Sequence, residues 1–190
     1  FRADASKYIG GGHINRCNQL AYFYSKLNCK TYLITKNNTL KYLPNDHKFS
    51  EVIYLSEDDE FFEIKSKYKS GCDLLIIDNY KITYKYQKLY SDWAKKILII
   101  NDYKNSKFYG DMRLNQNLQN RFIKTKNKIY LNGPQFSLIN PTYFYDRNKI
   151  INLKHHNKKF KNILISFGLT DPLKLTMPII LEILKINKNF

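Results

Sequence analysis

Cysteine is scarce in this chain, and the few cysteines are scattered. Cys17, Cys29 and Cys72 are odd in number and far apart, so no disulfide framework is expected. They form no Cys-x-x-Cys pair, and the adjacent His155 and His156 lack the i, i+4 spacing that places two metal ligands on one helix face. We therefore expect reduced, buried cysteines, as in a cytoplasmic protein, and no zinc site.

Long apolar runs are also missing. Apolar residues make up 43% of the chain, yet no run approaches the roughly 20 residues that a membrane span needs. The first residues, Phe1-Arg2-Ala3-Asp4, are not the basic start and apolar stretch of a secretory signal. These absences predict a cytoplasmic location and no membrane partner.

Acidic residues are half as numerous as basic ones, 16 against 32, which gives a formal net charge of +16. The excess is almost all Lys and is spread from end to end, whereas nucleic-acid-binding proteins usually concentrate Lys and Arg on one face. The densest basic stretch, residues 154–161, is interpreted as solvated linker. We expect no nucleic-acid partner and keep a non-catalytic basic binding module as an alternative.

Strand-like and helix-like segments alternate along the chain, which is typical of a parallel sheet covered by helices on both faces. Residues 74–77 and 97–100 are continuous apolar runs and indicate central strands. The predicted fold is α/β with a Rossmann-type parallel sheet. We predict strands at 1–3, 32–34, 52–55, 74–77, 97–100, 112–114 and 129–131, and helices at 13–27, 58–63 and 84–95.

The chain divides near residue 147, where the sequence becomes polar and basic. We interpret 1–146 as one domain and 147–161 as a linker. A strand at 162–167 and a helix to 186, with Asp171 as N-cap and Pro172 at its first position, would follow. Because one strand and one helix cannot bury a core, residues 162–190 are expected to be the truncated start of a second domain.

The run Gly10-Gly11-Gly12 leads into the first predicted helix. Backbone without side chains lets amide groups approach an anion closely, and the helix start adds unpaired amides, so this loop is a candidate phosphate cradle. His13 faces the positive end of the helix dipole, which favours a neutral base near pH 7, although a histidine that only caps the helix fits as well. Arg16, one turn on, is expected to meet phosphate or Asp4.

Other polar side chains follow the central strands, where ligands of open parallel sheets bind. Asp78 and Tyr80 follow one strand and Asp102 follows the next. Carboxylates at strand ends often cap neighbouring backbone, and no paired D-x-D occurs, so we expect no catalytic metal.

Six motifs occur in order along the chain. They are Arg2-Ala3-Asp4-Ala5-Ser6 with Ile9-Gly10-Gly11-Gly12-His13-Ile14-Asn15-Arg16, Leu75-Ile76-Ile77-Asp78-Asn79-Tyr80, Asn101-Asp102, Asp111-Met112-Arg113-Leu114-Asn115-Gln116-Asn117, Gly133-Pro134-Gln135-Phe136-Ser137-Leu138-Ile139-Asn140-Pro141 and Ser166-Phe167-Gly168-Leu169-Thr170-Asp171. Together they resemble the nucleotide-sugar hydrolases of the pseudaminic acid pathway, the PseG and SpsG family.

The resemblance implies the two-Rossmann-domain architecture of GT-B glycosyltransferases, with an active site between the halves. It implies hydrolysis of UDP-2,4-diacetamido-2,4,6-trideoxy-β-L-altropyranose at the anomeric carbon, without metal or cofactor. His13 would help to activate water, Tyr80 would lie near the sugar, and the glycine loop would face the diphosphate. The substrate-binding residues would be Asp4, Gly10, Gly11, Gly12, Arg16, Asp78, Asp102, Asn115, Asn117, Gly168 and Asp171.

Three residues depart from the family pattern: Asn101, Asn140 and Leu169. Leu169 replaces a glycine in a loop meant to approach phosphate, where a branched side chain would crowd the ligand. By the resemblance, the uridine-binding remainder of the second domain is absent from these 190 residues, and two alternatives stay open for it: the same chain, or a fusion to another enzyme of sugar activation. We therefore expect weak or no hydrolase activity from this chain alone. A MurG-like glycosyltransferase is an alternative.

Overall fold

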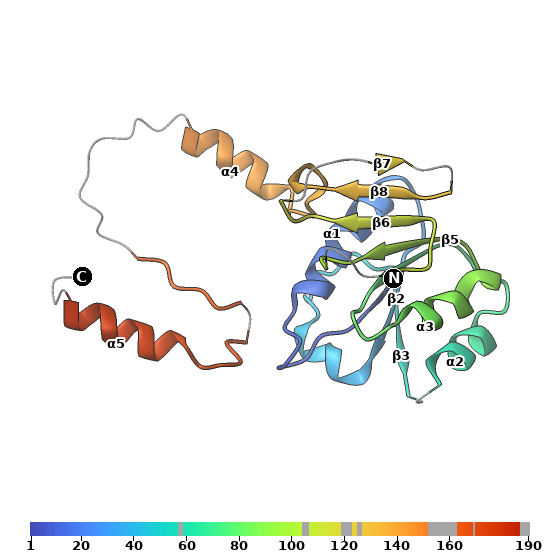
Figure 1. The fold of residues 1–190 in the computed structure, drawn as a ribbon, viewed down its shortest axis with the longest axis horizontal. Coiled ribbons are helices and arrows are strands. Elements are labelled where there is room, and N and C mark those ends of the chain that lie inside the picture. The colour runs from blue at the N-terminus through green and yellow to red at the C-terminus, as the bar shows by residue number, and fades with distance from the viewer. Residues whose placement is uncertain are drawn as a thin grey trace.

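The computed structural model describes residues 1–56, 59–103, 107–118, 123–124, 127–151, 163–168 and 170–186. Its centre is an eight-stranded sheet in the order β3-β2-β1-β4-β5-β6-β8-β7 (Figure 1). Neighbouring strands run parallel except β7, which pairs antiparallel with β8. The strands are β1 (Arg2–Ala3), β2 (Tyr32–Lys36), β3 (Glu51–Leu55), β4 (Cys72–Asp78), β5 (Ala94–Ile100), β6 (Met112–Asn115), β7 (Ile123–Lys124) and β8 (Ile129–Asn132).

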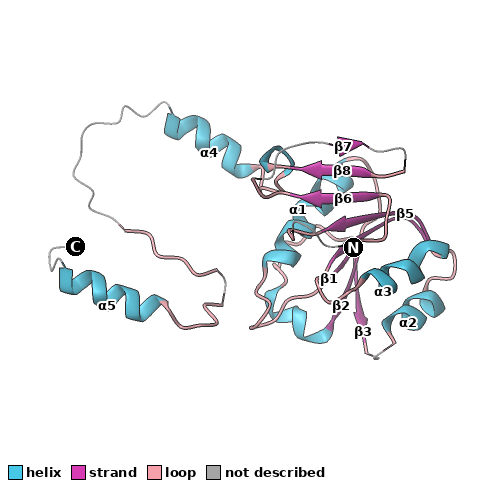
Figure 2. Ribbon diagram, viewed as in Figure 1, coloured by secondary structure: helices cyan, strands magenta, loops and turns pink. Residues whose placement is uncertain are grey.

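Helices lie on both faces of this sheet (Figure 2). The α-helices are α1 (Gly12–Lys26), α2 (Glu60–Lys67), α3 (Tyr84–Leu89), α4 (Thr142–Ile151) and α5 (Thr176–Ile186). Three short 3₁₀ helices span Asn37–Tyr42, Tyr90–Asp92 and Pro134–Phe136. The predicted α/β class with a Rossmann-type parallel sheet is confirmed.

Alternate side chains of the central strands enter two separate cores. Ile77 and Ile99 pack on the face that carries α2, with Ile64 of that helix. Ile76 and Leu98 belong to the opposite core, where side chains of α1 pack. Both faces of β4 and β5 are therefore buried, which explains their continuous apolar sequences.

Helix α1 presents an apolar stripe to the sheet. Ile14, Cys17 and Ala21 are fully buried at steps of three and four residues. The helix ends at Lys26, and Asn28 adopts a left-handed φ of 57°. Leu27, the last residue of the predicted helix, lies past the helix end and is 71% exposed. Cys29 is a free thiol in the same exposed turn, so the expectation that it is buried was wrong.

The predicted helix at 84–95 was too long. Helix α3 ends at Leu89, a 3₁₀ turn follows, and Ala94 already belongs to β5, where it pairs with Cys72 of β4. The indole N–H of Trp93 donates to the backbone oxygen of Tyr68 at 2.7 Å. Sheet pairing with a distant strand therefore overrides the local helical spacing.

The C-terminal segments also differ from the prediction. Helix α4 runs to Ile151, so the first residues of the expected linker are helical. Residues 163–167 form no strand. Helix α5 begins at Thr176 and not at Pro172, because Asp171 has a φ of 38° and its carboxylate accepts hydrogen bonds from the amides of Leu175 and Thr176. Leu169 and the basic stretch 154–161 lie outside the described residues.

Candidate active site at the carboxyl ends of β1, β4 and β5

The candidate site lies where the strand order changes direction. β1 is flanked by β2 on one side and by β4 on the other. The chain leaves β1 toward α1 on one face of the sheet, and it leaves β4 toward α3 on the other face (Figure 1). The loops therefore diverge at the carboxyl ends of these strands, where open α/β sheets bind their ligands.

His13 and Asp78 form a buried dyad at this position. The His13 Nδ1 atom lies 2.6 Å from Asp78 Oδ1, and Asp78 is wholly buried. Arg16 Nη2 also lies 3.2 Å from Nδ1, but it donates to Asp78 Oδ1 at the shorter distance of 2.6 Å. Because a carboxylate only accepts hydrogen bonds, we assign the proton of the neutral ring to Nδ1, which leaves Nε2 as an acceptor. Nε2 has no hydrogen-bond partner among the described residues, so a bound molecule has access to it.

Arg16 links this dyad to the end of β5. Its guanidinium bonds both carboxylate oxygens of Asp78, and its Nη1 donates to Asp102 Oδ2 at 2.6 Å. Burial alone would lower the pKa of Arg16, but the two carboxylates hold it above its ordinary value. We had expected Arg16 to meet phosphate or Asp4, and the structure pairs it with Asp78 and Asp102 and not with Asp4.

Tyr80 completes the cluster. Its hydroxyl donates to Asp102 Oδ2 at 2.6 Å, and its ring meets that of His13 edge to face, with 4.7 Å between the centroids. Burial and the hydrogen bond to Asp102 raise the pKa of Tyr80 to about 12, so the hydroxyl stays protonated near neutral pH. Asp102 Oδ1 is buried and has no hydrogen-bond partner within the described part of the chain.

Asp4 lies behind the site and holds the strand ends together. Its carboxylate accepts hydrogen bonds from the Lys36 amide at 2.9 Å and from Asn79 Nδ2 at 2.8 Å, and it pairs with Arg2 at 2.6 Å. Arg2 is 1% exposed and also binds Glu60 through two hydrogen bonds. We had not singled out Arg2, although an arginine within a short apolar strand is a signal that it needs a buried partner.

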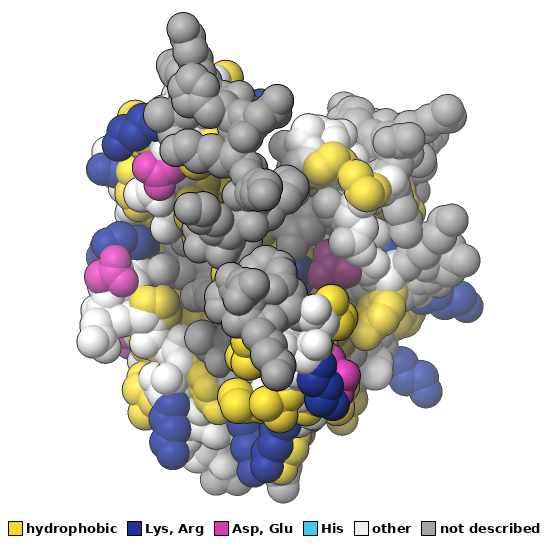
Figure 3. All heavy atoms as spheres, turned by 90° about the vertical axis from the view of Figure 1, so that its left-hand side faces the viewer, with side chains coloured by type: hydrophobic (Ala, Val, Ile, Leu, Met, Phe, Trp, Pro, Cys, Tyr) yellow, Lys and Arg dark blue, Asp and Glu magenta, His cyan; other side chains and the backbone are white. Residues whose placement is uncertain are grey.

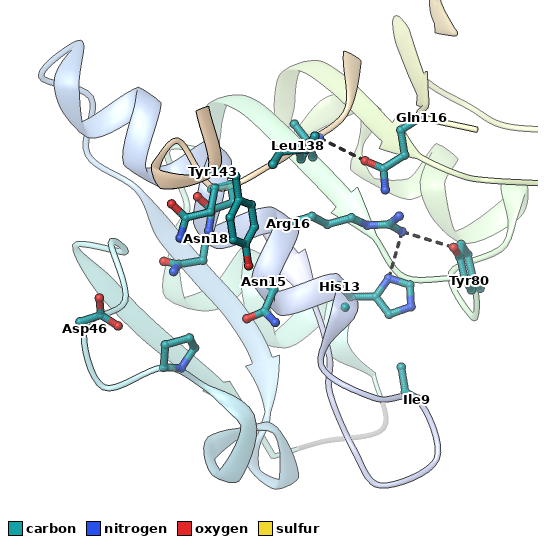
Figure 4. Close-up of a pocket in the computed structure, with 15 residues that line it drawn as sticks. Ile9, His13, Asn15, Arg16, Asn18, Asp46, Tyr80, Gln116, Leu138 and Tyr143 are labelled. Atoms are coloured by element: carbon teal, nitrogen blue, oxygen red, sulfur yellow. Dashed lines mark hydrogen bonds between the residues drawn. The ribbon is translucent and has the colours of Figure 1, made fainter. Parts of the chain in front are cut away.

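A cavity of about 730 Å³ opens in front of the dyad (Figure 4). Its size is within the range of sites for small organic ligands. It is lined by Ile9, Gly12, His13, Asn15, Arg16, Asn18, Gln19, Pro44, Asp46, Tyr80, Gln116, Leu138, Ile139, Asn140 and Tyr143.

Of the expected site residues, Gly12, His13, Arg16 and Tyr80 line this cavity, and Asp78 and Asp102 support them from behind. Gly10 adopts a φ of 76° and its amide donates to the Ser6 carbonyl oxygen at 2.7 Å, so it shapes the turn. Gly11, which is buried in the same turn, is not part of the cavity lining.

The expected residues after β6 are arranged differently. Asn115 is 1% exposed and its side chain accepts from the Asn117 amide, while Asn117 donates to the Asp102 carbonyl oxygen. Gln116, between them, lines the cavity. Gly168 and Asp171 lie beside α5 and are not part of the lining.

Sequence reasoning missed most of the lining. Helical spacing was an available signal, because Gly12, Asn15, Arg16 and Gln19 recur at i, i+3, i+4 and i+7 and share one face of α1. The loop residues Pro44 and Asp46 carry no such periodic signal.

The described residues place no group of three or more His, Cys, Asp or Glu where it could hold a metal ion. Among the helices within those residues, none has the length and apolar character that a membrane crossing requires. On the side where α4 and α5 lie, the described Lys and Arg side chains are interspersed with hydrophobic and uncharged ones (Figure 3).

No protein-family model matches this chain. Among curated proteins it is similar to an uncharacterized protein of Methanocaldococcus jannaschii, with 30% identity over 195 aligned positions that cover 98% of this chain and 40% of the relative. The chain thus spans less than half of the length of the curated relative it matches.

The arrangement can move a proton next to a bound molecule. A neutral imidazole oriented by a buried carboxylate is a general base, and the carboxylate stabilises the imidazolium that forms when the base accepts a proton. The first amides of a helix have no acceptor within it and favour negative charge, and Gly12, the first residue of α1, lines the same cavity.

Proposed function

We propose that this chain is the water-activating part of a nucleotide-sugar hydrolase that releases UDP from UDP-2,4-diacetamido-2,4,6-trideoxy-β-L-altropyranose. The observation that carries the proposal is the Asp78–His13 dyad, whose free Nε2 faces a cavity large enough for a sugar. The ordered motifs that resemble the pseudaminic-acid-pathway hydrolases support the choice of substrate.

In the proposed reaction a water molecule in the cavity attacks the anomeric carbon. His13 Nε2 accepts a proton from that water, and Asp78 stabilises the resulting imidazolium. The bond between the anomeric carbon and the diphosphate oxygen breaks, and UDP leaves with the bonding electrons. Negative charge grows on the diphosphate, and the free amides at the start of α1 favour it electrostatically.

Tyr80 keeps the base in position in this scheme. Its ring packs against the edge of His13, and its hydroxyl is anchored on Asp102. Because the hydroxyl stays protonated, Tyr80 can donate a hydrogen bond to the sugar only by leaving Asp102, so we assign it contact with the sugar through its ring.

The test is hydrolysis in H₂¹⁸O by the protein as its gene encodes it, because the chain spans 40% of its relative. Attack at carbon places ¹⁸O in the released sugar, and His13→Gln is expected to lower kcat at least about 100-fold. His47→Gln is the matched control, since His47 packs on Phe49 and does not line the cavity. Full activity of His13→Gln, or ¹⁸O in UDP, would contradict the proposal. UDP release that requires an added sugar acceptor would indicate the glycosyltransferase alternative instead.

A further inference from the structure

Five side chains of the cavity wall are carboxamides: Asn15, Asn18, Gln19, Gln116 and Asn140. In three of them the oxygen accepts a hydrogen bond from a backbone amide, which belongs to a distant segment for Asn18 and Gln116 and to the following turn for Asn140. The Lys48 amide donates to Asn18 Oδ1 at 2.7 Å, the Leu138 amide donates to Gln116 Oε1 at 3.2 Å, and the Thr142 amide donates to Asn140 Oδ1 at 3.0 Å. Figure 4 shows the bond from Leu138 to Gln116 above Arg16.

These contacts fix which way each carboxamide faces. A backbone N–H only donates, and the oxygen is the only acceptor of a carboxamide, so the amide cannot turn over without losing the bond. The NH₂ groups of Asn18, Gln116 and Asn140 have no hydrogen-bond partner among the described residues, and none is a buried unpaired atom. The cavity therefore holds three neutral donors of fixed orientation.

Among the described lining residues, no free cation stands beside these three carboxamides to balance an anion. The Arg16 guanidinium is engaged by Asp78 and Asp102, and among the described lining residues only His13 otherwise gains positive charge. Asp46 adds a carboxylate to the same wall. A cavity wall with hydrogen-bond donors but no free cation suits a neutral ligand that is rich in hydrogen-bond acceptors.

We propose that Asn18, Gln116 and Asn140 determine specificity by binding the carbonyl oxygens of acylamido groups on a neutral sugar. A carbonyl oxygen only accepts hydrogen bonds and therefore matches these NH₂ donors, whereas a hydroxyl also brings a proton that needs an acceptor of its own. The chemical class of the ligand follows from this geometry; its identity as the transferred sugar rests on the proposed function.

Isosteric substitution tests the assignment. Asn18→Asp, Gln116→Glu and Asn140→Asp keep the oxygen that the backbone amide needs and remove the NH₂ donor. Calorimetric titration with free 2,4-diacetamido-2,4,6-trideoxy-L-altrose is expected to show about tenfold weaker binding for each variant. Asn38→Asp makes the same change at an exposed carboxamide that is not part of the cavity lining, and this variant is expected to bind the sugar as the wild-type protein does.

The wild-type protein supplies a test that needs no variant. It is expected to bind the diacetamido sugar at least about tenfold more tightly than 6-deoxy-L-altrose, which carries hydroxyls in place of both acetamido groups. Equal affinity for the two sugars, no binding of either, or equal weakening by Asn38→Asp would overturn the inference.

The two proposals can fail separately. Discrimination between the sugars without UDP release would leave the carboxamide assignment standing and contradict the hydrolase proposal. Release of UDP at equal rates from the diacetamido and the dihydroxy substrates would contradict the carboxamide assignment and leave the hydrolase proposal standing.

Discussion

Asp78 is the residue on which the geometry of the site depends. It is wholly buried and binds both His13 and Arg16. Asp78→Asn leaves Asp102 as the only carboxylate paired with Arg16. It also permits the tautomer of His13 in which Nε2 carries the proton and cannot act as a base, so we expect kcat to fall about 10⁴-fold. Loss of a buried partner is expected to lower the free energy of unfolding by about 3 kcal/mol. Steady-state kinetics and urea unfolding measure the two effects.

The matched control for Asp78→Asn is Asp73→Asn on the same strand. Asp73 pairs with Lys95 at the surface, where both side chains are largely exposed. Solvent screens such a pair, and we expect neither activity nor stability to change measurably. Equal effects of the two substitutions would contradict the role given to the buried dyad.

Asp4 links stability to pH. Burial alone would raise its pKa, but the ion pair with Arg2 and the hydrogen bonds from Lys36 and Thr35 hold it below the ordinary value. Between the two pKa values the unfolded chain binds more protons, so this contribution is present above about pH 4 and is lost as the pH falls through the folded pKa. We expect Asp4→Asn to be about 2 kcal/mol less stable than the wild-type protein at pH 7.

Urea unfolding of both proteins between pH 2 and pH 7 measures this linkage. The two stability curves are expected to converge as the pH falls, because protonation removes from the wild-type protein what the substitution has already removed. A constant gap down to the lowest pH would show that the Asp4 charge contributes nothing.

At the scale of elements, Gly10 in the turn before α1 and Gly12 at the first position of that helix have different tasks. Gly10 has a φ of 76°, which a residue with a Cβ adopts only under strain, although there is open space around it. Gly12 is helical and also has open space where a Cβ would lie, on the wall of the cavity. Gly10→Ala is expected to cost about 1 kcal/mol of stability, while Gly12→Ala costs none.

For substrate binding we expect the opposite: Gly12→Ala has the larger effect. A methyl group at Gly12 occupies the place where a diphosphate would approach the first amides of α1, so the KM of Gly12→Ala is expected to rise about tenfold or more. Gly10→Ala changes KM little. An unchanged KM for Gly12→Ala would contradict binding of the diphosphate at the start of this helix.

The elements that the sequence predicts best are those with a local pattern. The apolar runs of β4 and β5 and the three- and four-residue spacing of α1 are visible without any partner. The end of α3 is not, because Ala94 joins β5 through pairing with Cys72, a contact between distant residues. The orientation of Asn18 depends in the same way on the Lys48 amide, thirty residues away. An element with a local pattern can therefore be predicted from the sequence, but the direction in which a side-chain amide faces cannot.

At the scale of the whole molecule, the core and the cavity occupy the same part of the chain. The buried hydrophobic side chains lie between Ala3 and Leu114, and the cavity lining runs from Ile9 to Tyr143. Helix α5 has no buried residue, although Met177, Leu181 and Leu184 are apolar. In Figure 1 it stands apart from the sheet.

A chain that ends after Ile151 is therefore expected to keep both the fold and the sugar cavity. Its free energy of unfolding should lie within about 0.5 kcal/mol of that of the 190-residue chain, because the described residues beyond Ile151 contribute no buried side chain to either core. Its affinity for the diacetamido sugar should also be unchanged, since every lining residue is retained. Urea unfolding and calorimetric titration of the two chains side by side measure this. A loss of more than about 1 kcal/mol, or of sugar binding, would show that the C-terminal segment stabilises the sheet or helps to form the cavity.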